Sequence, residues 1–280
     1  MNGDMADLPD ARDLLRKHGL SPKRSFSQNF LVQPHATARI ADAAAELGHD
    51  VVELGPGLGA LTHALLARGC RVLAVELDRD MVRVLRDELG QQPQLEVRVG
   101  DAADIDITAY SKACGAKLVV TGNLPYQSTG AIVRQIIRHR DVLRGAVLMV
   151  QREVRDRLVA EPGSKDYGAL TVFTQAGFEV ETLFRLKPGS FFPPPQVESA
   201  VVRLRPRSAV RAEETPTFRA TVRAAFQMRR KTLRNALRAI GGTERWAAAA
   251  ANAGVDLARR GETLSVEEFA RLAASYDALA

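Results

Sequence analysis

The stretch around which the chain is organised reads Val119-Val120-Thr121-Gly122-Asn123-Leu124-Pro125-Tyr126. Its β-branched residues predict a strand, and Asn-Leu-Pro-Tyr predicts a tight corner where that strand ends. Because Pro125 fixes its own φ and holds Leu124 extended, the Leu124 carbonyl can point into a cleft. The Asn123 side-chain oxygen is a second acceptor, and Tyr126 supplies a flat ring. Such a corner can grip a planar base that carries an amino group, although a plain proline turn is the commoner meaning of an isolated Asn-x-Pro-Tyr.

Strands and helices alternate around this corner. Apolar runs predict strands over residues 50–54, 71–76, 95–99, 118–121 and 145–150, and apolar residues at helical spacing lie between most of them, with an earlier helix over 34–47. This alternation predicts an α/β fold, a doubly wound parallel sheet with helices on both faces. Farther on, residues 170–178, 180–186 and 200–204 resemble strands with short links, which can pair antiparallel at one edge of the sheet.

The length of 280 residues allows one large and one small domain. We expect a flexible N-terminal segment over residues 1–20, a Rossmann-like domain over 21–206 and a small all-α domain over 207–280. Thr215-Pro216 predicts a helix start in the last of these. Ser265-Val266-Glu267-Glu268 predicts a capping box before the final helix.

Composition and charge limit the classes of partner. The net charge of +6 and the pI near 9.6 favour a polyanion, which leaves nucleic acid and a membrane surface open. The two cysteines and five histidines lack the spacing of metal ligands, so we expect no metal. No apolar run reaches the roughly 18 residues that a membrane helix needs. The N-terminus lacks the pattern of a signal peptide, and we expect a monomeric cytoplasmic protein without a membrane partner.

Residues at the carboxyl ends of the first three predicted strands can form a cofactor site, because ligands bind there in open α/β sheets. Gly55 and Gly57 let the backbone approach a ligand closely. Glu76 ends the second strand about 20 residues later, where a carboxylate reaches a ribose diol. This unit alone leaves NAD and S-adenosylmethionine open. Glu53 before the turn and Asp101 after the third strand favour the latter, since Asp101 can accept from an adenine amine; a helix N-cap is the competing interpretation of Asp101.

Glu53-Leu54-Gly55-Pro56-Gly57-Leu58-Gly59, together with the Asn-Leu-Pro-Tyr corner, resembles the class I adenine-N6 methyltransferases. Further stretches narrow the resemblance to the ribosomal RNA adenine dimethylase family, and within it to the bacterial small-subunit branch. These stretches are Gln28-Asn29-Phe30-Leu31, residues 151–154 with 162–168, residues 191–199, and residues 226–237 (FQMRRKTLRNAL). Together they span about residues 20 to 275, and their order makes the resemblance specific.

The resemblance implies a class I S-adenosylmethionine-dependent methyltransferase that dimethylates N6 of two adjacent adenosines near the 3′ end of 16S rRNA in the small ribosomal subunit. It implies that Asn29 and Leu31 close over the methionine end of the cofactor. The implied cofactor contacts are Asn29, Leu31, Gly55, Glu76, Asp101 and Asn123. The sequence departs from the family at Gln127, where Asn or Ser is usual, and at Ser27, where Gly is usual. Neither residue replaces a group assigned to chemistry.

The implied chemistry centres on the corner. The Asn123 side-chain oxygen and the Leu124 carbonyl can accept the two N–H bonds of adenine N6 and so favour an electron-rich nitrogen. The base must leave its stack to reach this pocket, and aromatic faces offset the cost. With Pro125 shaping the corner, Tyr126 is one expected face and Phe191 the candidate for the other. A core position is the competing interpretation of Phe191.

Basic residues in the C-terminal part of the chain suggest contact with RNA phosphates. The residues that we expect to bind RNA are Arg229, Arg230, Lys231 and Arg234, and Arg152 and Lys165 are further candidates. A solvated basic face explains the same cluster equally well. Two other functions stay open: a macrolide-resistance type of enzyme that modifies a large-subunit adenosine and usually has Ile at position 124, and a ribosome-assembly factor whose binding matters more than its catalysis.

Overall fold

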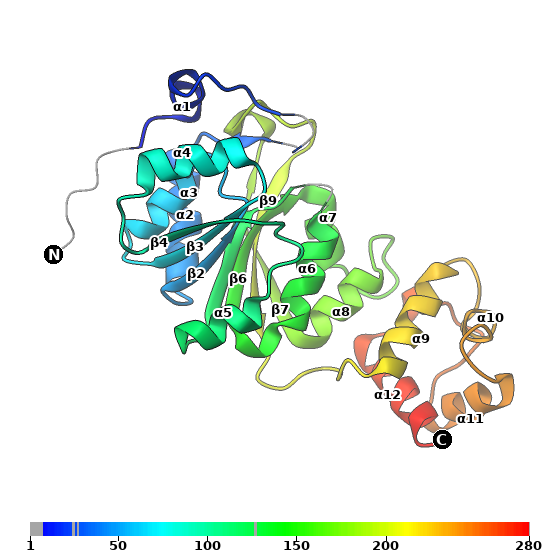
Figure 1. Cartoon of the computed structure of the whole chain (residues 1–280). Coiled ribbons are helices and arrows are strands. Elements are labelled where there is room, and N and C mark those ends of the chain that lie inside the picture. The colour runs from blue at the N-terminus through cyan, green and yellow to red at the C-terminus, as the bar shows by residue number, and fades with distance from the viewer. Residues whose placement is uncertain (1–7, 24–25, 27, 126–127, 280) are drawn as a thin grey trace. The chain divides into compact units, whose positions relative to one another are not determined.

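The computed structural model describes residues 8–23, 26, 28–125 and 128–279. The chain forms two compact units (Figure 1). The first comprises Met1–Arg155 and Glu181–Pro206, and the second Asp156–Val180 and Arg207–Ala280. The sequence predicted boundaries at residues 20 and 206, whereas in the structure residues 156–180 also group with the helical unit.

The first unit is built on a seven-stranded sheet. Its elements are α1 (Ala11–Lys17), β1 (Phe30–Leu31), α2 (Pro34–Ala45), β2 (Asp50–Leu54), α3 (Ala60–Leu66), β3 (Arg71–Glu76), α4 (Arg79–Leu89), β4 (Leu95–Val99), α5 (Ile107–Cys114), β5 (Leu118–Asn123), α6 (Thr129–Arg138), β6 (Leu143–Gln151), β8 (Phe191–Phe192) and β9 (Ser199–Pro206). Two elements run from one unit into the other: α7 (Arg152–Leu158) and β7 (Phe178–Leu186).

The strand order is β4-β3-β2-β5-β6-β9-β7. The pairs from β4 to β6 are parallel, and β9 pairs antiparallel with β6. The predicted doubly wound sheet with an antiparallel edge is thereby confirmed. The chain moves outward from β2 in one direction through β3 and β4, and then crosses to β5 on the other side. The ends of β2 and β5 therefore form the topological switch point, where open α/β sheets bind ligands.

Helices cover both faces of this sheet, with α2 and α3 behind it and α5 and α6 in front in Figure 1. On the α2 side, the hydrophobic core joins Ile40, Leu65 and Val72 with residues of β5, β6 and β9. The strands β2 and β3 are buried nearly throughout, which explains their continuous apolar sequences. Among the described residues, no helix has both the length and the apolar composition to cross a membrane.

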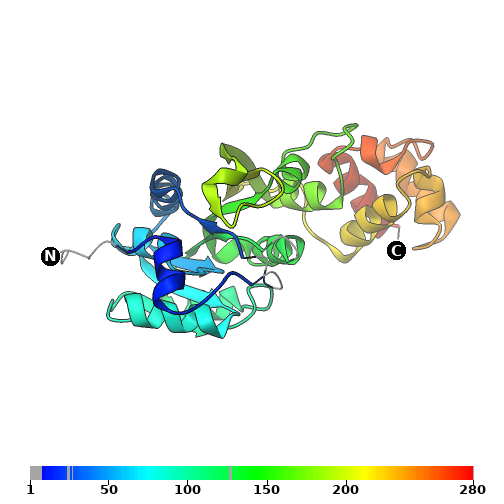
Figure 2. The same ribbon diagram turned by 90° about the horizontal axis from the view of Figure 1, so that it is seen from above.

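The N-terminal segment differs from the prediction. Residues 1–20 were expected to be flexible, but Ala11–Lys17 form α1, and the Asp10 carboxylate caps its first turn. Leu14 and Leu15 are buried against Leu58 and Met81. A helix of only seven residues has a weak local signal, because its stability comes from burying this leucine pair. Figure 2 shows α1 passing over the end of the sheet.

The second unit is mainly helical. Its helices are α8 (Ala169–Gly177), α9 (Pro216–Gln227), α10 (Leu233–Leu237), α11 (Thr243–Ala253) and α12 (Val266–Asp277). The predicted caps are confirmed: Thr215 accepts from the Phe218 backbone, and Ser265 and Glu268 form the capping box.

The prediction of a strand over residues 170–178 is wrong, because this stretch forms α8. Its β-branched residues favour a strand. However, most of the helix is buried, and side-chain hydrogen bonds to carbonyls one turn earlier are compatible with the helical backbone. The Thr174 hydroxyl, for example, donates to the Leu170 carbonyl at 2.8 Å. Burial on nearly all sides also removes the polar face that would have revealed helical periodicity.

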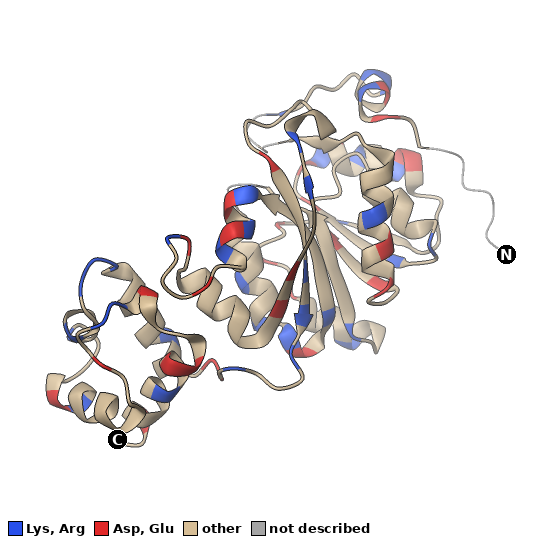
Figure 3. Cartoon of the chain, turned by 180° about the vertical axis from the view of Figure 1, so that it is seen from behind, with Lys and Arg blue, Asp and Glu red and all other residues tan. Residues whose placement is uncertain are grey.

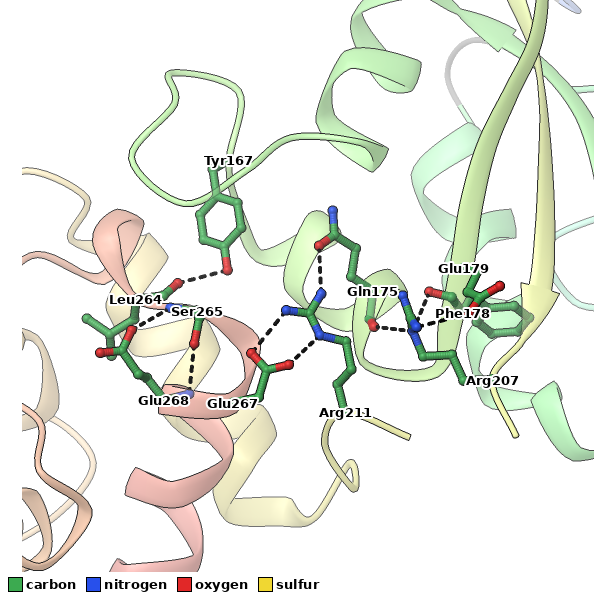
Figure 4. Close-up of polar contacts among 10 residues, drawn as sticks. All are labelled: Tyr167, Gln175, Phe178, Glu179, Arg207, Arg211, Leu264, Ser265, Glu267 and Glu268. Carbon is green, nitrogen blue, oxygen red and sulfur yellow. Dashed lines mark hydrogen bonds and ion pairs between the residues drawn. The ribbon is translucent and has the colours of Figure 1, made fainter. Parts of the chain in front are cut away.

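Polar contacts fasten α8 to α12 and to the chain between β9 and α9 within the second unit (Figure 4). Arg211 forms two hydrogen bonds with the Glu267 carboxylate, at 2.5 and 3.0 Å, and a third with the Gln175 side chain. The buried Tyr167 hydroxyl donates to the Leu264 carbonyl at 2.8 Å. The segment before α8 is therefore an integral part of the helical unit.

Candidate functional site

A cavity of about 740 Å³ lies in the first unit at the switch point of the sheet. The ends of β2, β3 and β5 line it, as do residues after β4 and several N-terminal residues, among them Leu8, Leu14 and Gln28. All six predicted cofactor contacts belong to this lining: Asn29, Leu31, Gly55, Glu76, Asp101 and Asn123. Residues spread over almost a hundred positions of sequence thus meet at one site.

The glycine turn after β2 forms one wall. Gly55 and Gly57 have φ of 69° and 58°, in the left-handed region that side chains rarely adopt. A Cβ on Gly57 would stand 3.1 Å from the Phe30 ring, so the turn also needs glycine for space. A Cβ on Gly55 would lie 3.7 Å from the Asn123 carbonyl, which shows how closely the two strand ends approach.

Glu76 is the carboxylate at the end of β3. Its Oε2 accepts from the Gly57 backbone at 3.0 Å and its Oε1 from the Asp78 backbone at 2.9 Å. The residue is 8% exposed, and burial raises the pKa of its carboxyl group, an effect that these backbone hydrogen bonds counter. Each carboxylate oxygen keeps a lone pair, so the group can still accept from a ribose hydroxyl.

Glu53, which also lines the cavity, is 1% exposed. Burial raises its pKa to about 8, although the Thr62 hydroxyl donates to Oε2 at 2.6 Å and opposes the shift. The neighbouring charge of Glu76 adds to the rise. Sequence reasoning missed Thr62; the available signal was a polar residue on the apolar face that Leu61 and Leu65 mark on α3.

The Asn123 amide is held in one orientation. Its Nδ2 donates to the Asn29 backbone carbonyl at 2.9 Å. Because a carbonyl oxygen can only accept, the amide atom that faces it must be the nitrogen and not Oδ1. Within the described ranges, Oδ1 of Asn123 has no hydrogen-bond donor. Beside it, the Leu124 backbone N–H donates to Met149 at 3.0 Å, whereas no described residue donates to the Leu124 carbonyl. Two acceptors are therefore available at the predicted corner.

Asp101 follows β4, and its Oδ1 accepts from the Ala103 backbone at 2.8 Å in a local turn. It is not the cap of the next helix, since Asp106 caps α5. Its other oxygen accepts from no residue in the described part of the chain and can receive an adenine amine. The cavity thus joins a carboxylate suited to ribose, one suited to adenine, and a glycine turn that a Cβ would fill. These features fit S-adenosylmethionine.

The structure places the two aromatic candidates differently. Phe191 is 4% exposed, belongs to the hydrophobic core and pairs with Leu31 between β8 and β1. It does not line the cavity, so its ring is not presented to a base, and the core interpretation holds for this residue. Its burial depends on a pairing between distant segments, which the Phe-Phe-Pro sequence could not reveal. Tyr126 and Gln127 lie outside the described residues, as does Ser27.

The basic residues of the second unit are not equivalent. Arg229 forms an ion pair with Glu262 at 2.7 Å and also donates to the Lys165 carbonyl. Arg230, Lys231 and Arg234 are exposed, and no acid of the described chain pairs with them. Figure 3 shows Lys and Arg on the loop that follows α9. Three of the four predicted RNA contacts are therefore available to an anion, and the fourth is already engaged.

Comparisons with known proteins agree with this geometry. The chain is 45% identical to a "Ribosomal RNA small subunit methyltransferase A" from Pelotomaculum thermopropionicum, over 95% of each chain. Among solved structures it resembles the 23S rRNA methyltransferase ErmE, with a TM-score of 0.66 and 29% identity over 89% of this chain and 100% of that one. A dimethyladenosine transferase from Plasmodium falciparum shares the fold, with a TM-score of 0.70 and 23% identity over 87% and 95% of the two chains.

The family described as "Ribosomal RNA adenine dimethylase" matches residues 19–278, which is nearly the whole chain. This match confirms the predicted class I methyltransferase fold, the predicted activity on ribosomal RNA adenine and S-adenosylmethionine as the cofactor. The chain belongs to the ribosomal RNA adenine dimethylase family.

Proposed function

We propose that this protein dimethylates N6 of two adjacent adenosines in the 3′-terminal hairpin of 16S rRNA, with S-adenosylmethionine as methyl donor. The observation that carries the proposal is the orientation of the Asn123 amide: Nδ2 donates to Asn29, and Oδ1, which accepts from no described residue, can accept from a base amine. The small-subunit methyltransferases that are about 45% identical over almost their whole length support this choice of substrate.

The lone pair of adenine N6 is delocalised into the ring, so the amine is a poor nucleophile. If Asn123 Oδ1 and the Leu124 carbonyl accept its two N–H bonds, the nitrogen can become pyramidal and keep its lone pair for the reaction. Such acceptors stabilise the positive charge that develops on nitrogen, and they are already in place before the reaction begins. When bound, S-adenosylmethionine supplies an electrophilic methyl group on a sulfonium. The N6 proton can leave afterwards to water, and the site mainly supplies position.

RNA recognition by the second unit is part of the proposal. Arg230, Lys231 and Arg234 would contact phosphates, whereas Arg229 would hold the loop through its bonds to Glu262 and Lys165. Contacts of this kind bind RNA without reading its sequence. We further propose that the protein acts as a monomer in the cytoplasm, where small subunits are assembled.

A methyl-acceptor assay tests this function. Unmethylated small subunits, large subunits and naked 16S rRNA are each incubated with the protein and labelled S-adenosylmethionine. We expect up to four methyl groups per small subunit, two on each adenosine, and none on large subunits. Nuclease digestion should yield N6,N6-dimethyladenosine. Labelling of large subunits alone would overturn the proposed substrate.

The resemblance to ErmE supports a second candidate, methylation of a large-subunit adenosine. The identity of 29% is lower than the 45% shared with small-subunit enzymes, and Leu124 stands where that type usually has Ile. A third candidate is an assembly factor whose binding matters more than methylation. It predicts that a catalytically inactive Asn123 variant supports small-subunit assembly as well as the native chain does.

A further inference from the structure

Asp78 is a buried carboxylate that the proposed chemistry does not use. Its side chain is 3% exposed, yet every oxygen has a donor. Oδ1 accepts from Lys23 Nζ at 2.8 Å and from the Asp80 backbone at 3.0 Å, and Oδ2 accepts from Gln28 Nε2 at 2.8 Å. Gln28 is the one donor to Oδ2 among the described residues, so removing its side chain leaves a buried oxygen without a hydrogen bond.

Gln28 is bonded at both ends of its amide. Nε2 donates to Asp78, and Oε1 accepts from the Lys23 backbone at 2.8 Å. Since a carboxylate can only accept and a backbone N–H can only donate, glutamine is the residue that meets both demands. A glutamate here would place two carboxylates in contact. An alanine would leave Oδ2 of Asp78 without its donor and the Lys23 backbone N–H without its acceptor, while Oδ1 of Asp78 would keep its bonds to Lys23 and Asp80.

These bonds join the two halves of the site. On one side, the Asp78 backbone N–H donates to Oε1 of Glu76, the carboxylate suited to the ribose. On the other side, Gln28 is followed directly by Asn29, whose carbonyl accepts from Nδ2 of Asn123. The bonds run from Glu76 through Asp78 and Gln28 to Asn123. The bond between Gln28 and Asp78 joins residues 50 positions apart, and the bond between Asn29 and Asn123 joins residues 94 positions apart.

We propose that Gln28 is a positioning residue for methyl transfer. Through Asp78 it fixes the place of the Asn29 carbonyl, and that carbonyl holds the Asn123 amide with Oδ1 turned to the base amine. Without this anchor the amide can rotate and present its own N–H groups to the N–H groups of the base, which repel. The proposal rests on the function proposed above, since it assigns Gln28 a part in the same reaction.

A double-mutant cycle tests the proposal. Single-turnover methyl transfer to small subunits is measured for the native chain, Gln28→Ala, Asn123→Ala and the double variant. We expect Gln28→Ala to slow transfer at least about tenfold, as small misplacements at a reacting centre do. In the Asn123→Ala background the same change should have no effect, because the group that Gln28 positions is absent. Equal slowing in both backgrounds, or no slowing at all, would overturn the proposal.

Lys17→Ala is the matched control. Lys17 pairs with Glu88 at 2.8 Å in the same N-terminal region, but it has no contact with Gln28 or Asp78. We expect native transfer rates and native affinity for S-adenosylhomocysteine. Thermal unfolding is followed for all variants. If Gln28→Ala lost its cooperative transition, Gln28 would be a stability residue and the positioning role would be rejected.

A second measurement does not depend on the identity of the RNA. The side-chain amide protons of Asn123, assigned in NMR spectra by their loss in Asn123→Ala, should exchange slowly in the native chain and in Lys17→Ala. In Gln28→Ala they should exchange at least about tenfold faster, since the bond to Asn29 is no longer held. Unchanged exchange would overturn the inference even if small subunits are methylated. Absence of methylation by the native chain, with faster exchange in Gln28→Ala, would instead reject only the proposed function.

Discussion

The acidic residues beside the cavity of the first unit and those of α12 in the second unit are held in opposite ways. In the first unit, burial beside the cofactor cavity raises the pKa of Glu53 to about 8 and raises that of Glu76. In the second unit, Arg211 lowers the pKa of Glu267 to about 2, and Arg259 lowers that of Glu268. The first arrangement keeps carboxyl groups in a dry site where they can meet a ligand. The second uses arginine to fasten helices, and it leaves other arginines exposed.

The largest effect should come from the corner of the first unit. Asn123→Ala removes an acceptor assigned to the transition state, so we expect single-turnover methyl transfer to fall by roughly 10²–10³-fold, as for loss of one preorganised hydrogen bond. Small-subunit binding, measured by filter retention, should change little because the basic residues lie in the second unit. Near-native transfer would mean that the corner is a structural turn only.

The pH dependence of stability should distinguish the two units. Folding raises the pKa of Glu53 from 4.5 to about 8. The protonated Glu53 carboxyl therefore contributes its full stability below pH 4.5, the pKa in the unfolded chain, and this stability is lost as the pH rises through 8. In the native chain the unfolding free energy should therefore decrease between about pH 5 and pH 8. In Glu53→Gln, which cannot ionise at this position, we expect this decrease to be smaller by about 3 kcal/mol. Urea unfolding followed by far-UV circular dichroism measures this. Identical pH profiles for variant and native chain would contradict it.

Glu76→Ala tests the cofactor half. A ribose hydroxyl would lose a charged acceptor, so binding of S-adenosylmethionine should weaken by about 1.5–3 kcal/mol. Isothermal titration of the variant against the native chain measures the change. Glu179→Ala, which removes an exposed acid that pairs with Arg207 in the second unit, is the control and should bind normally. Unchanged affinity in Glu76→Ala would place the ribose elsewhere.

The exposed cations of the second unit should affect RNA binding alone. Changing Arg230, Lys231 and Arg234 to Gln should lower the slope of log affinity against log salt by about 0.7 for each lost phosphate contact, with cofactor affinity unchanged. Arg229→Gln is the matched comparison. Because its guanidinium already pairs with Glu262, we expect a smaller change of slope. Parallel slopes for the triple variant and the native chain would mean that these residues form a solvated face.

The smallest effect concerns the ion pair of α12. The lowered pKa of Glu267 gives stability that is present above its unfolded value of 4.5 and is lost as pH falls through about 2. The Glu267 side chain is 45% exposed, so Arg211→Gln should cost no more than about 1 kcal/mol at pH 7. The fluorescence of Trp246, the chain's only tryptophan, reports on this unit. An equal cost at pH 2 and pH 7 would reject the ionic origin.

Local patterns in the sequence predicted the parallel sheet and brought the candidate cofactor residues to notice. The predicted strands 50–54, 71–76 and 95–99 coincide with β2, β3 and β4, because continuous apolar runs between turn residues carry a strong local signal. The predicted glycine turn and Asn123 line the same cavity, because motifs at strand ends converge in this topology. The capping box of α12 is also purely local.

Contacts between distant segments produced the features that no local pattern predicted. Burial made α8 a helix despite its β-branched residues, and it made α1 a helix through two buried leucines. Pairing of β8 with β1 took Phe191 into the core. The orientation of Asn123 depends on a backbone carbonyl 94 residues away. A sequence shows which groups a chain possesses, whereas the neighbour that buries or bonds each group is chosen only when the whole chain packs.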